Sequence, residues 1–145
     1  MESILLIILI GLAGGVAVGL QSTMASMISQ RLGLLESVFI IHLGGALFVL
    51  VPLLIYRGGK LAQWQSLPWY TLAAGIFGLI VIGAISYMIP RVGVAAAVTT
   101  VIVGQLFISM ILDHFGLLGA AEKSLDVTRV IGLVVVLAGV WLMVK

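Results

Sequence analysis

The stretch ILLIILIGLAGGVAVGL, from Ile4 to Leu20, contains no charged and no polar side chain. A helix that crosses the hydrocarbon core of a bilayer needs about 20 mostly apolar residues. This run exceeds the apolar core of a signal peptide, no lysine or arginine precedes it, and no clean cleavage site follows it. We therefore expect a retained first membrane span that begins near Ser3.

The composition of the whole chain also indicates a membrane protein. Of its 145 residues, 63% are hydrophobic and 8% are charged, whereas a soluble domain carries about 25% charged residues. A surface so poor in charge would not keep the protein monomeric in water. The net charge of +2 is small and scattered along the chain, so nothing suggests a nucleic-acid partner. The expected surroundings are the lipid bilayer.

Five segments are long and apolar enough to span a membrane. The length of the chain allows one domain. We predict an all-α, polytopic membrane protein whose single transmembrane domain covers residues 1–145. The predicted helices cover about residues 3–30, 37–56, 68–89, 93–114 and 127–144.

Two connections between these spans have any length, 57–67 and 115–126. Tyrosine and tryptophan side chains lie in or beside the first connection, and such side chains prefer the membrane–water boundary. We therefore expect this connection to lie in the interface. The aromatic residues are Tyr56, Trp64, Trp69 and Tyr70.

An odd number of spans places the two termini on opposite sides of the membrane. Lysine and arginine then number 4 on the N-terminal side and 3 on the other. A difference of 4 − 3 = 1 is a weak orientation signal under the positive-inside rule. Two interpretations stay open, a fixed orientation set by other means and insertion in both orientations. The residues are Arg57, Lys60, Lys123 and Arg129 on the first side, and Arg31, Arg91 and Lys145 on the second.

Catalytic and cofactor-binding motifs are missing from the sequence. It contains no nucleophile elbow, no zinc-protease motif, no P-loop and no dinucleotide-binding motif. It has no cysteine, and its two histidines lie on different spans, which does not make a metal site. We expect no enzyme activity, no cofactor and no metal.

Small residues line one face of the first span. Gly11, Gly15 and Gly19 recur at every fourth position, and serines continue the same face at Ser22, Ser26 and Ser29. Small residues let helix backbones approach closely in lipid, so a packing face is the simpler interpretation of the glycines. The serines fit a packing face and a substrate path equally well. In the last span Gly132 and Gly139 indicate a similar packing seam.

Polar side chains inside the spans are few, and each is a functional candidate because polar groups in hydrocarbon are costly. Gln21 lies in the deep half of the first span, and His42 lies on the antiparallel second span, so the two could meet. On the fourth span Gln105, Ser109 and Asp113 recur at every fourth position. They therefore form a polar stripe from the middle of that helix to its end.

The same helix ends in the stretch GQLFISMILDHFG, Gly104 to Gly116. Asp113 and His114 come about one full span after Gly93, which places them at the membrane boundary, and Gly116 stands where a C-cap glycine belongs. They either mark where the helix surfaces or serve as a gate, a salt bridge or a proton relay. An aspartate at a helix C-terminus is unfavourable for the helix dipole, so helix stability does not explain it.

His42 also has two interpretations. It could simply form a hydrogen bond with a neighbour such as Gln21. Histidine is also the side chain that most readily changes charge near neutral pH, and a proton-coupled carrier would need such a group at depth.

The chain resembles the YdcZ family of small five-span bacterial membrane proteins in the drug/metabolite transporter superfamily. The resemblance covers essentially the whole chain, and its most specific part is the stretch from Gly104 to Gly119. The segments that carry it are GLQSTMASMISQRLG (Gly19–Gly33), PRVGVAAA (Pro90–Ala97), GQLFISMILDHFGLLG (Gly104–Gly119) and RVIGLVVVLAGVWL (Arg129–Leu142).

The resemblance implies a carrier-like protein of the bacterial inner membrane. Larger relatives join two inverted five-span halves, so this chain would be one half-repeat, and the smallest relatives work as antiparallel dimers. Gln21, Gln105, Asp113 and His114 are the motif positions in this chain. Ala25 stands where the family often has asparagine, and His42 stands where phenylalanine is common. Gln21 is the nearest equivalent of the membrane glutamate of the tiny multidrug exporters, and it cannot carry a proton.

These observations lead to one hypothesis and two alternatives. The hypothesis is a small-solute secondary transporter, an exporter rather than an importer, that works by alternating access with a second, inverted copy of itself or an oppositely oriented paralogue. The alternatives are a non-transporting subunit of another membrane protein and a small channel. The predicted cavity lining is Gln21, Ser22, His42, Gln105 and Ser109, and the predicted gate or proton relay is Asp113 and His114.

Overall fold

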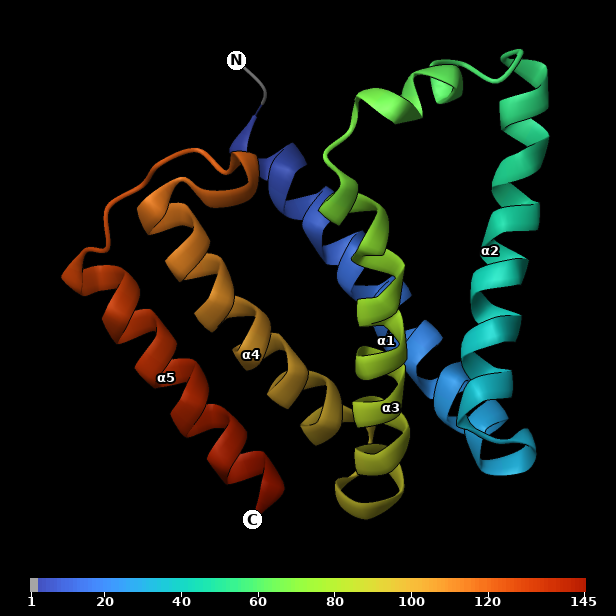
Figure 1. Cartoon of the computed structure of the whole chain (residues 1–145). Helices are drawn as coiled ribbons and strands as arrows, with labels where there is room; N and C mark the ends of the chain where they lie inside the picture. Colours follow the sequence, from blue (N-terminus) through green and yellow to red (C-terminus); the bar gives the residue numbers. More distant parts are fainter. Residues whose placement is uncertain (1–2) are drawn as a thin grey trace. The chain divides into compact units, whose positions relative to one another are not determined.

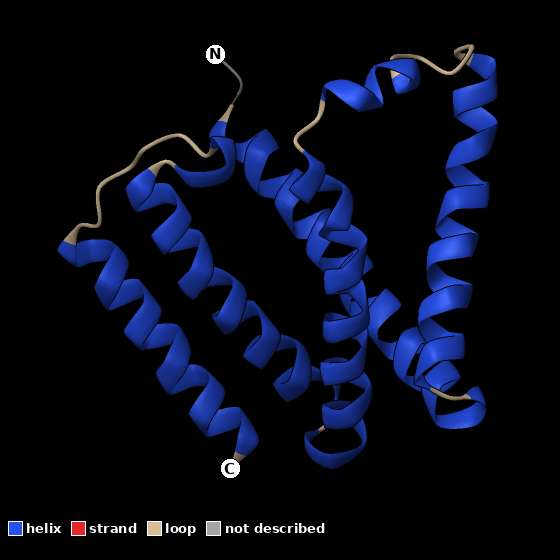
Figure 2. Ribbon diagram, in the orientation of Figure 1, coloured by secondary structure: helices blue, strands red, loops and turns tan. Residues whose placement is uncertain are grey.

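The computed structural model describes residues 3–145, which are mostly helical and contain no strand (Figures 1 and 2). Five of its helical segments are long and apolar enough to cross a membrane, which confirms the predicted all-α protein with five spans. The α-helices are α1 (Ile4–Leu32), α2 (Leu34–Ile55), α3 (Ala74–Val92), α4 (Val94–Phe115) and α5 (Val127–Val144), and the short 3₁₀ helices are η1 (Leu61–Ser66), η2 (Trp69–Ala73) and η3 (Leu117–Gly119).

Side-chain caps fix the starts of two helices. The Ser3 hydroxyl accepts a hydrogen bond from the backbone N–H of Leu6 at 3.2 Å, at the start of α1. The Asp126 carboxylate accepts one from the N–H of Arg129 at 2.7 Å, at the start of α5. Both are N-cap contacts of the usual kind, which satisfy backbone donors that the helix leaves free.

Single glycines join consecutive helices at two places. Gly33 separates α1 from α2 with φ 121°, and Gly93 separates α3 from α4 with φ 84°. Residues that carry a side chain rarely adopt such positive φ values, so glycine suits both positions. The connection at Gly33 is shorter than the sequence suggested, since residues 31–36 were expected to form it.

The third span begins with η2 instead of an α-helix. Pro68 is the N-cap of η2, and α-helical geometry starts at Ala74. At its other end α3 continues through Pro90 to Val92, beyond the predicted end at residue 89. Proline within a membrane helix is tolerated because neighbouring groups satisfy the freed backbone atoms.

The chain divides into two compact units, Met1–Tyr87 and Met88–Lys145. In the first unit α1 packs against α2. Ser37 on α2 is 0% exposed, and its hydroxyl donates a hydrogen bond to the backbone carbonyl of Ala25 on α1 at 2.9 Å. Ala25 and Ser26 are each 1% exposed, because small side chains let the two backbones approach closely.

In the second unit α4 and α5 pack side by side (Figure 1). The chain between them forms η3 and an extended segment that returns to the end of α4.

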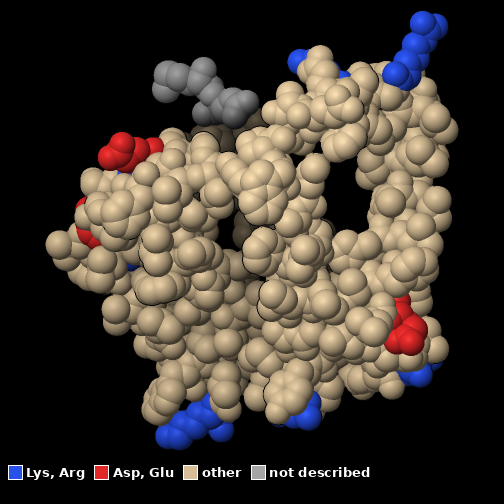
Figure 3. Space-filling view, viewed as in Figure 1, with Lys and Arg blue, Asp and Glu red and all other residues tan. Residues whose placement is uncertain are grey.

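Most of the surface is apolar. Large side chains such as Phe48 on α2, which is 83% exposed, project outward from the helices. On the face in Figure 3 charged side chains are few and separated by broad areas without charge. Such a surface is suited to lipid or to another membrane protein.

Candidate functional site

Gln21 and Ser22 project to different sides of α1. Ser22 is 4% exposed, whereas the neighbouring Gln21 is exposed. Gln21 makes no hydrogen bond or ion pair with any residue in the range 3–145. Ser22 therefore lies on the packed face with Ala25 and Ser26, and Gln21 points away from it.

His42 on α2 lies against Gly78 on α3. Its Nδ1 pairs with the backbone carbonyl of Val38, one turn earlier, at 2.7 Å, so Nδ1 carries the proton in that contact. A side chain added at Gly78 would meet Nε2 and Cε1 of the ring. The imidazole thus bonds its own helix rather than Gln21, and its Nε2 edge faces α3.

Gln105 and Ser109 on α4 are both exposed. Within the part of the chain that the structure describes, neither side chain has a hydrogen-bond partner. Thr99 and Thr100, on the same helix, donate to the backbone carbonyls one turn earlier at 2.7 and 2.8 Å. The Gln105 amide and the Ser109 hydroxyl are therefore the polar groups of this span whose hydrogen-bonding capacity remains free, and the amide is the one in the middle of the helix.

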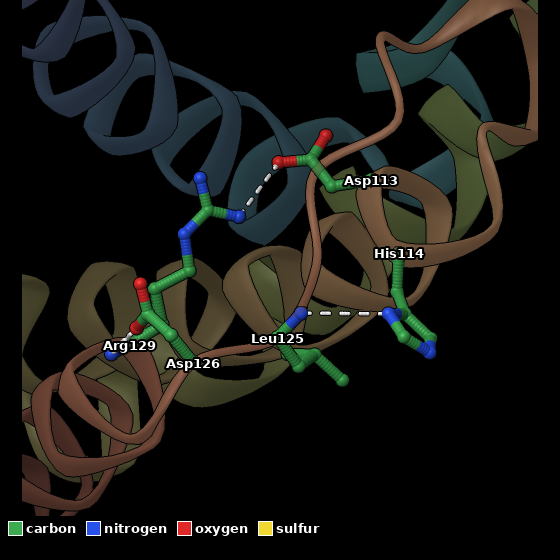
Figure 4. A network of polar contacts seen from close by, with 5 residues as sticks. All are labelled: Asp113, His114, Leu125, Asp126 and Arg129. Atoms are coloured by element: carbon green, nitrogen blue, oxygen red, sulfur yellow. Dashed lines mark hydrogen bonds and ion pairs between the residues drawn. The ribbon is translucent and has the colours of Figure 1, made fainter.

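Asp113 connects the end of α4 to the start of α5 (Figure 4). One carboxylate oxygen lies 3.5 Å from Nη1 of Arg129, which is in the first turn of α5. The backbone carbonyl of Asp113 accepts a hydrogen bond from the N–H of Lys123 at 2.8 Å. A carboxylate at a helix C-terminus and a guanidinium near a helix N-terminus are each unfavourable for the helix dipole, and the ion pair compensates both.

His114 contacts the same returning segment. Its Nδ1 accepts a hydrogen bond from the backbone N–H of Leu125 at 3.4 Å (Figure 4), which leaves the proton of a neutral ring on Nε2. The ring packs edge-on against Phe115, with centroids 4.8 Å apart. Gly116 ends α4 with φ 58°, in the left-handed conformation, which confirms the predicted C-cap glycine.

The structure thus brings together Asp113 and His114, which both fasten residues 123–129 to the end of α4. Gln21, Ser22 and His42 belong to the first unit, and Gln105 and Ser109 belong to the second. Their joint role in one cavity stays a prediction.

Three residues of these contacts were not singled out as site residues from the sequence. Arg129 pairs with Asp113, Gly78 receives His42, and Ser37 joins α2 to α1. A basic residue just after a long connection, a glycine within a span and a serine near a helix start were the available signals. Glycines within spans and a serine near a helix start also occur elsewhere in the chain, and a basic residue after a connection does not by itself identify its partner, so none of these signals was decisive.

The described residues contain no cluster of side chains that could bind a metal ion. Among residues 3–145 no three His, Asp or Glu side chains are grouped as metal ligands would be. Two cavities, of about 260 and 450 Å³, lie instead in the connection between α2 and α3, away from the predicted site residues of the sequence.

Five apolar spans, with polar side chains placed singly along them, define the chain as a small multi-pass membrane protein. A family model described as "Putative inner membrane exporter, YdcZ" matches residues 6–142. The chain therefore belongs to the YdcZ family, as the sequence motifs indicated, and is a multi-pass protein of the inner membrane. That description supports a transport role, and an exporter is not an enzyme class. Comparisons with curated proteins and with solved structures gave no match.

Proposed function

We propose that this protein is a secondary transporter that exports a small solute by alternating access, as an antiparallel pair of identical chains. The observation that carries the proposal is the free amide of Gln105 in the middle of α4. An unsatisfied amide costs several kcal/mol in hydrocarbon, roughly 4–8 on a cyclohexane scale. A side chain of this kind needs a water-filled cavity or a second protein surface.

The antiparallel pair supplies such a cavity. Secondary carriers commonly place the substrate site near the bilayer midplane, at the interface of two inverted repeats. One five-span chain holds one such repeat, and a second copy inserted in the opposite orientation provides the other. The small difference in lysine and arginine count between the two sides permits both orientations.

In this proposal the candidate residues have different tasks. Gln21, His42, Gln105 and Ser109 line the cavity, and the packed Ser22 joins them in the conformation in which its face of α1 opens. The Nε2 edge of His42 offers a site for a coupling proton. Asp113 and His114 form the gate. Their contacts with Arg129 and Leu125 close the end of the α4–α5 hairpin, and opening the gate requires that these contacts separate.

Transport is tested with purified protein in liposomes. The vesicles hold a mixture of ethidium, alanine, glucose and glycine betaine under an imposed pH gradient, and mass spectrometry follows the solutes that remain inside. We expect faster loss of at least one solute than from protein-free vesicles. Gln105→Leu should abolish this loss.

Thr99→Val is the matched control for that variant. It removes a polar group from the same helix, but one whose hydroxyl bonds its own backbone, so transport should persist. Loss of transport in both variants would point to general damage of α4, and retention in both would remove Gln105 from the site. A chain that moves no solute would favour the non-transporting subunit, and conduction far beyond a carrier's turnover would favour the channel.

Orientation is tested separately. A reporter active only in the cytoplasm and another active only outside are fused after Lys145 and expressed at matched levels. Signal from both fusions is expected for a self-sufficient antiparallel pair. Signal from one alone would contradict it and would direct the search to an oppositely oriented paralogue.

A further inference from the structure

The connection between α2 and α3 is built as an amphipathic segment that runs across the ends of these helices (Figure 1, green). In a 3₁₀ helix, which has three residues per turn, side chains three apart lie directly above one another. Leu61 and Trp64 therefore form one apolar edge of η1, and Leu67 follows as its extended C-cap. The next edge carries Gln63 and Ser66, with Lys60 directly before the helix, so η1 separates apolar from polar side chains on these two edges.

These apolar side chains are at least half exposed in the described chain. Leu61 is 62% exposed, and Trp64 and Leu67 are each 51% exposed. The aromatic residues of η2 are exposed as well: Trp69 is 82% exposed and Tyr70 is 47% exposed. Amphipathic aromatic side chains are characteristic of the membrane–water boundary, and the segment directly follows a membrane span.

Two cations stand beside this segment. Arg57, Gly58 and Gly59 all have positive φ, at 53°, 79° and 54°, and form a tight turn after α2. Hydrogen bonds fix the turn, with the Gly58 N–H donating to the Leu53 carbonyl at 2.7 Å. The turn sets Arg57 and Lys60 on the two sides of Leu61 and Trp64.

Each cation borders a cavity that also has apolar walls. A cavity of about 260 Å³ is lined by the two edges of η1, with Lys60 and Gln63 as its polar donors and Trp64 and Leu67 among its apolar walls. A cavity of about 450 Å³ on the other side is lined by Arg57 together with Leu61 and Trp64. The Ser66 hydroxyl donates to the Gln63 carbonyl at 2.7 Å, so the side chains of Lys60, Gln63 and Arg57 and the indole N–H of Trp64 remain free donors.

The charge around these cavities is of one sign. No aspartate or glutamate occurs in residues 37–112, and Glu36 lies at the opposite end of α2 from Arg57. Neither Arg57 nor Lys60 forms an ion pair within the described part of the chain. Two unpaired cations next to an apolar edge at the bilayer surface match a ligand that has an anionic head and an apolar tail.

We propose that the segment Arg57–Leu67 is a binding site for an anionic phospholipid. The phosphate of the headgroup contacts Lys60 and Gln63 in the smaller cavity, and its acyl chains extend along Trp64 and Leu67. Arg57, on the other side of Leu61 and Trp64, adds attraction for the anionic headgroup. Basic residues at a membrane surface attract anionic lipids by an amount that falls with ionic strength. The site does not depend on what the protein transports, nor on its orientation.

The test uses Trp64 as its reporter. The chain has three tryptophans, and Trp69→Phe with Trp141→Phe leaves Trp64 alone. Its fluorescence is measured in bilayers of mixed phosphatidylglycerol and phosphatidylcholine, with bromine on the acyl chains of one lipid or the other. We expect brominated phosphatidylglycerol to quench Trp64 with a preference of roughly tenfold over phosphatidylcholine, declining with added salt.

Two double variants test whether Arg57 and Lys60 cause the preference for phosphatidylglycerol. Arg57→Gln with Lys60→Gln should remove the preference, whereas Arg31→Gln with Lys145→Gln removes the same charge elsewhere and should retain it. Equal quenching by the two lipids in the unmodified reporter chain would overturn the proposal. So would an equal loss in both double variants, which would reflect overall charge, and so would displacement of the lipid by excess inorganic phosphate. Circular dichroism of each variant checks that the helices are intact.

Discussion

The imidazole of His42 on α2 occupies the space that a side chain at Gly78 on α3 would fill. The ring is tethered in that position by the contact between its Nδ1 and the Val38 carbonyl at 2.7 Å. Position 78 therefore requires glycine because a larger side chain there would overlap the His42 ring on α2.

Gly78→Ala should not show the gain in stability that replacing glycine by alanine ordinarily gives a helix. Alanine is favoured over glycine by about 1 kcal/mol in a helix interior. Here the new methyl group would displace the ring and break its hydrogen bond, whose net worth is also about 1 kcal/mol. Unfolding in mixed micelles by denaturing detergent should show little or no net gain.

Gly83→Ala is the matched control on the same helix. A methyl group there would lie 3.5 Å from Leu34, an ordinary van der Waals distance, so this variant should be about 1 kcal/mol more stable than the unmodified chain. The double variant His42→Ala with Gly78→Ala should regain the stability that Gly78→Ala lacks. Equal effects at the two glycines would show that His42 does not constrain Gly78.

Ser37→Ala should weaken the contact between α1 and α2. The Ser37 side chain is 0% exposed and its hydroxyl bonds the Ala25 carbonyl. Hydrogen bonds between membrane helices are worth about 0.6 kcal/mol on average, and full burial sets the expectation nearer 1 kcal/mol. The same unfolding assay measures the loss. Ser66→Ala, whose hydroxyl bonds its own exposed segment, should change little, and comparable losses in the two variants would argue against a special role for Ser37.

Asp113 and Arg129 should be coupled, but weakly. Their side chains are 33–39% exposed, and partly exposed ion pairs contribute about 0.2–1 kcal/mol. A double-mutant cycle with Asp113→Asn and Arg129→Gln should give a coupling energy in this range that shrinks as salt is added. A coupling energy of zero at low salt would mean that the ion pair does not hold the hairpin.

The same two residues bear on the proposed gate. Asp113→Asn retains the backbone carbonyl that accepts from Lys123, so it leaves the returning segment attached while removing the charge. If Asp113 is part of the gate, the variant should slow solute loss from the vesicles, with Asp113→Glu closer to the unmodified chain. Full activity of Asp113→Asn would limit Asp113 to fastening the segment.

The sequence alone predicted the spans because a membrane imposes one simple requirement, a long apolar helix. The last span was predicted at residues 127–144, and α5 is Val127–Val144. Errors occurred where short-range chemistry decides the boundary. Gly33 alone makes a connection for which several residues were expected, and the third span starts with a 3₁₀ helix after Pro68.

The site was harder to predict because it depends on which side of a helix meets a neighbour. Gln21 and Ser22 are adjacent and both polar, yet one is exposed and the other is packed. Counting along the chain placed Asp113 and His114 at a helix end, but could not show that their partners are Arg129 and Leu125, 16 and 11 residues further on. These partners are set by the path of the connection, which has no regular pattern to read.

The glycine face of α1 provides the last prediction. A methyl group added at Gly11, Gly15 or Gly19 would meet nothing within 4 Å in the described chain, so the face that the sequence marked for packing is vacant within one copy. If a second chain covers it, Gly15→Leu should block the approach of that chain without harming the fold of its own. Energy transfer between donor-labelled and acceptor-labelled chains in liposomes should fall, while the helical content stays unchanged. Val16→Leu, on a neighbouring side of the helix that is 65% exposed, should leave energy transfer intact. Unchanged transfer in Gly15→Leu would place the contact between chains elsewhere, and loss of helical content would show that the face packs within the chain itself.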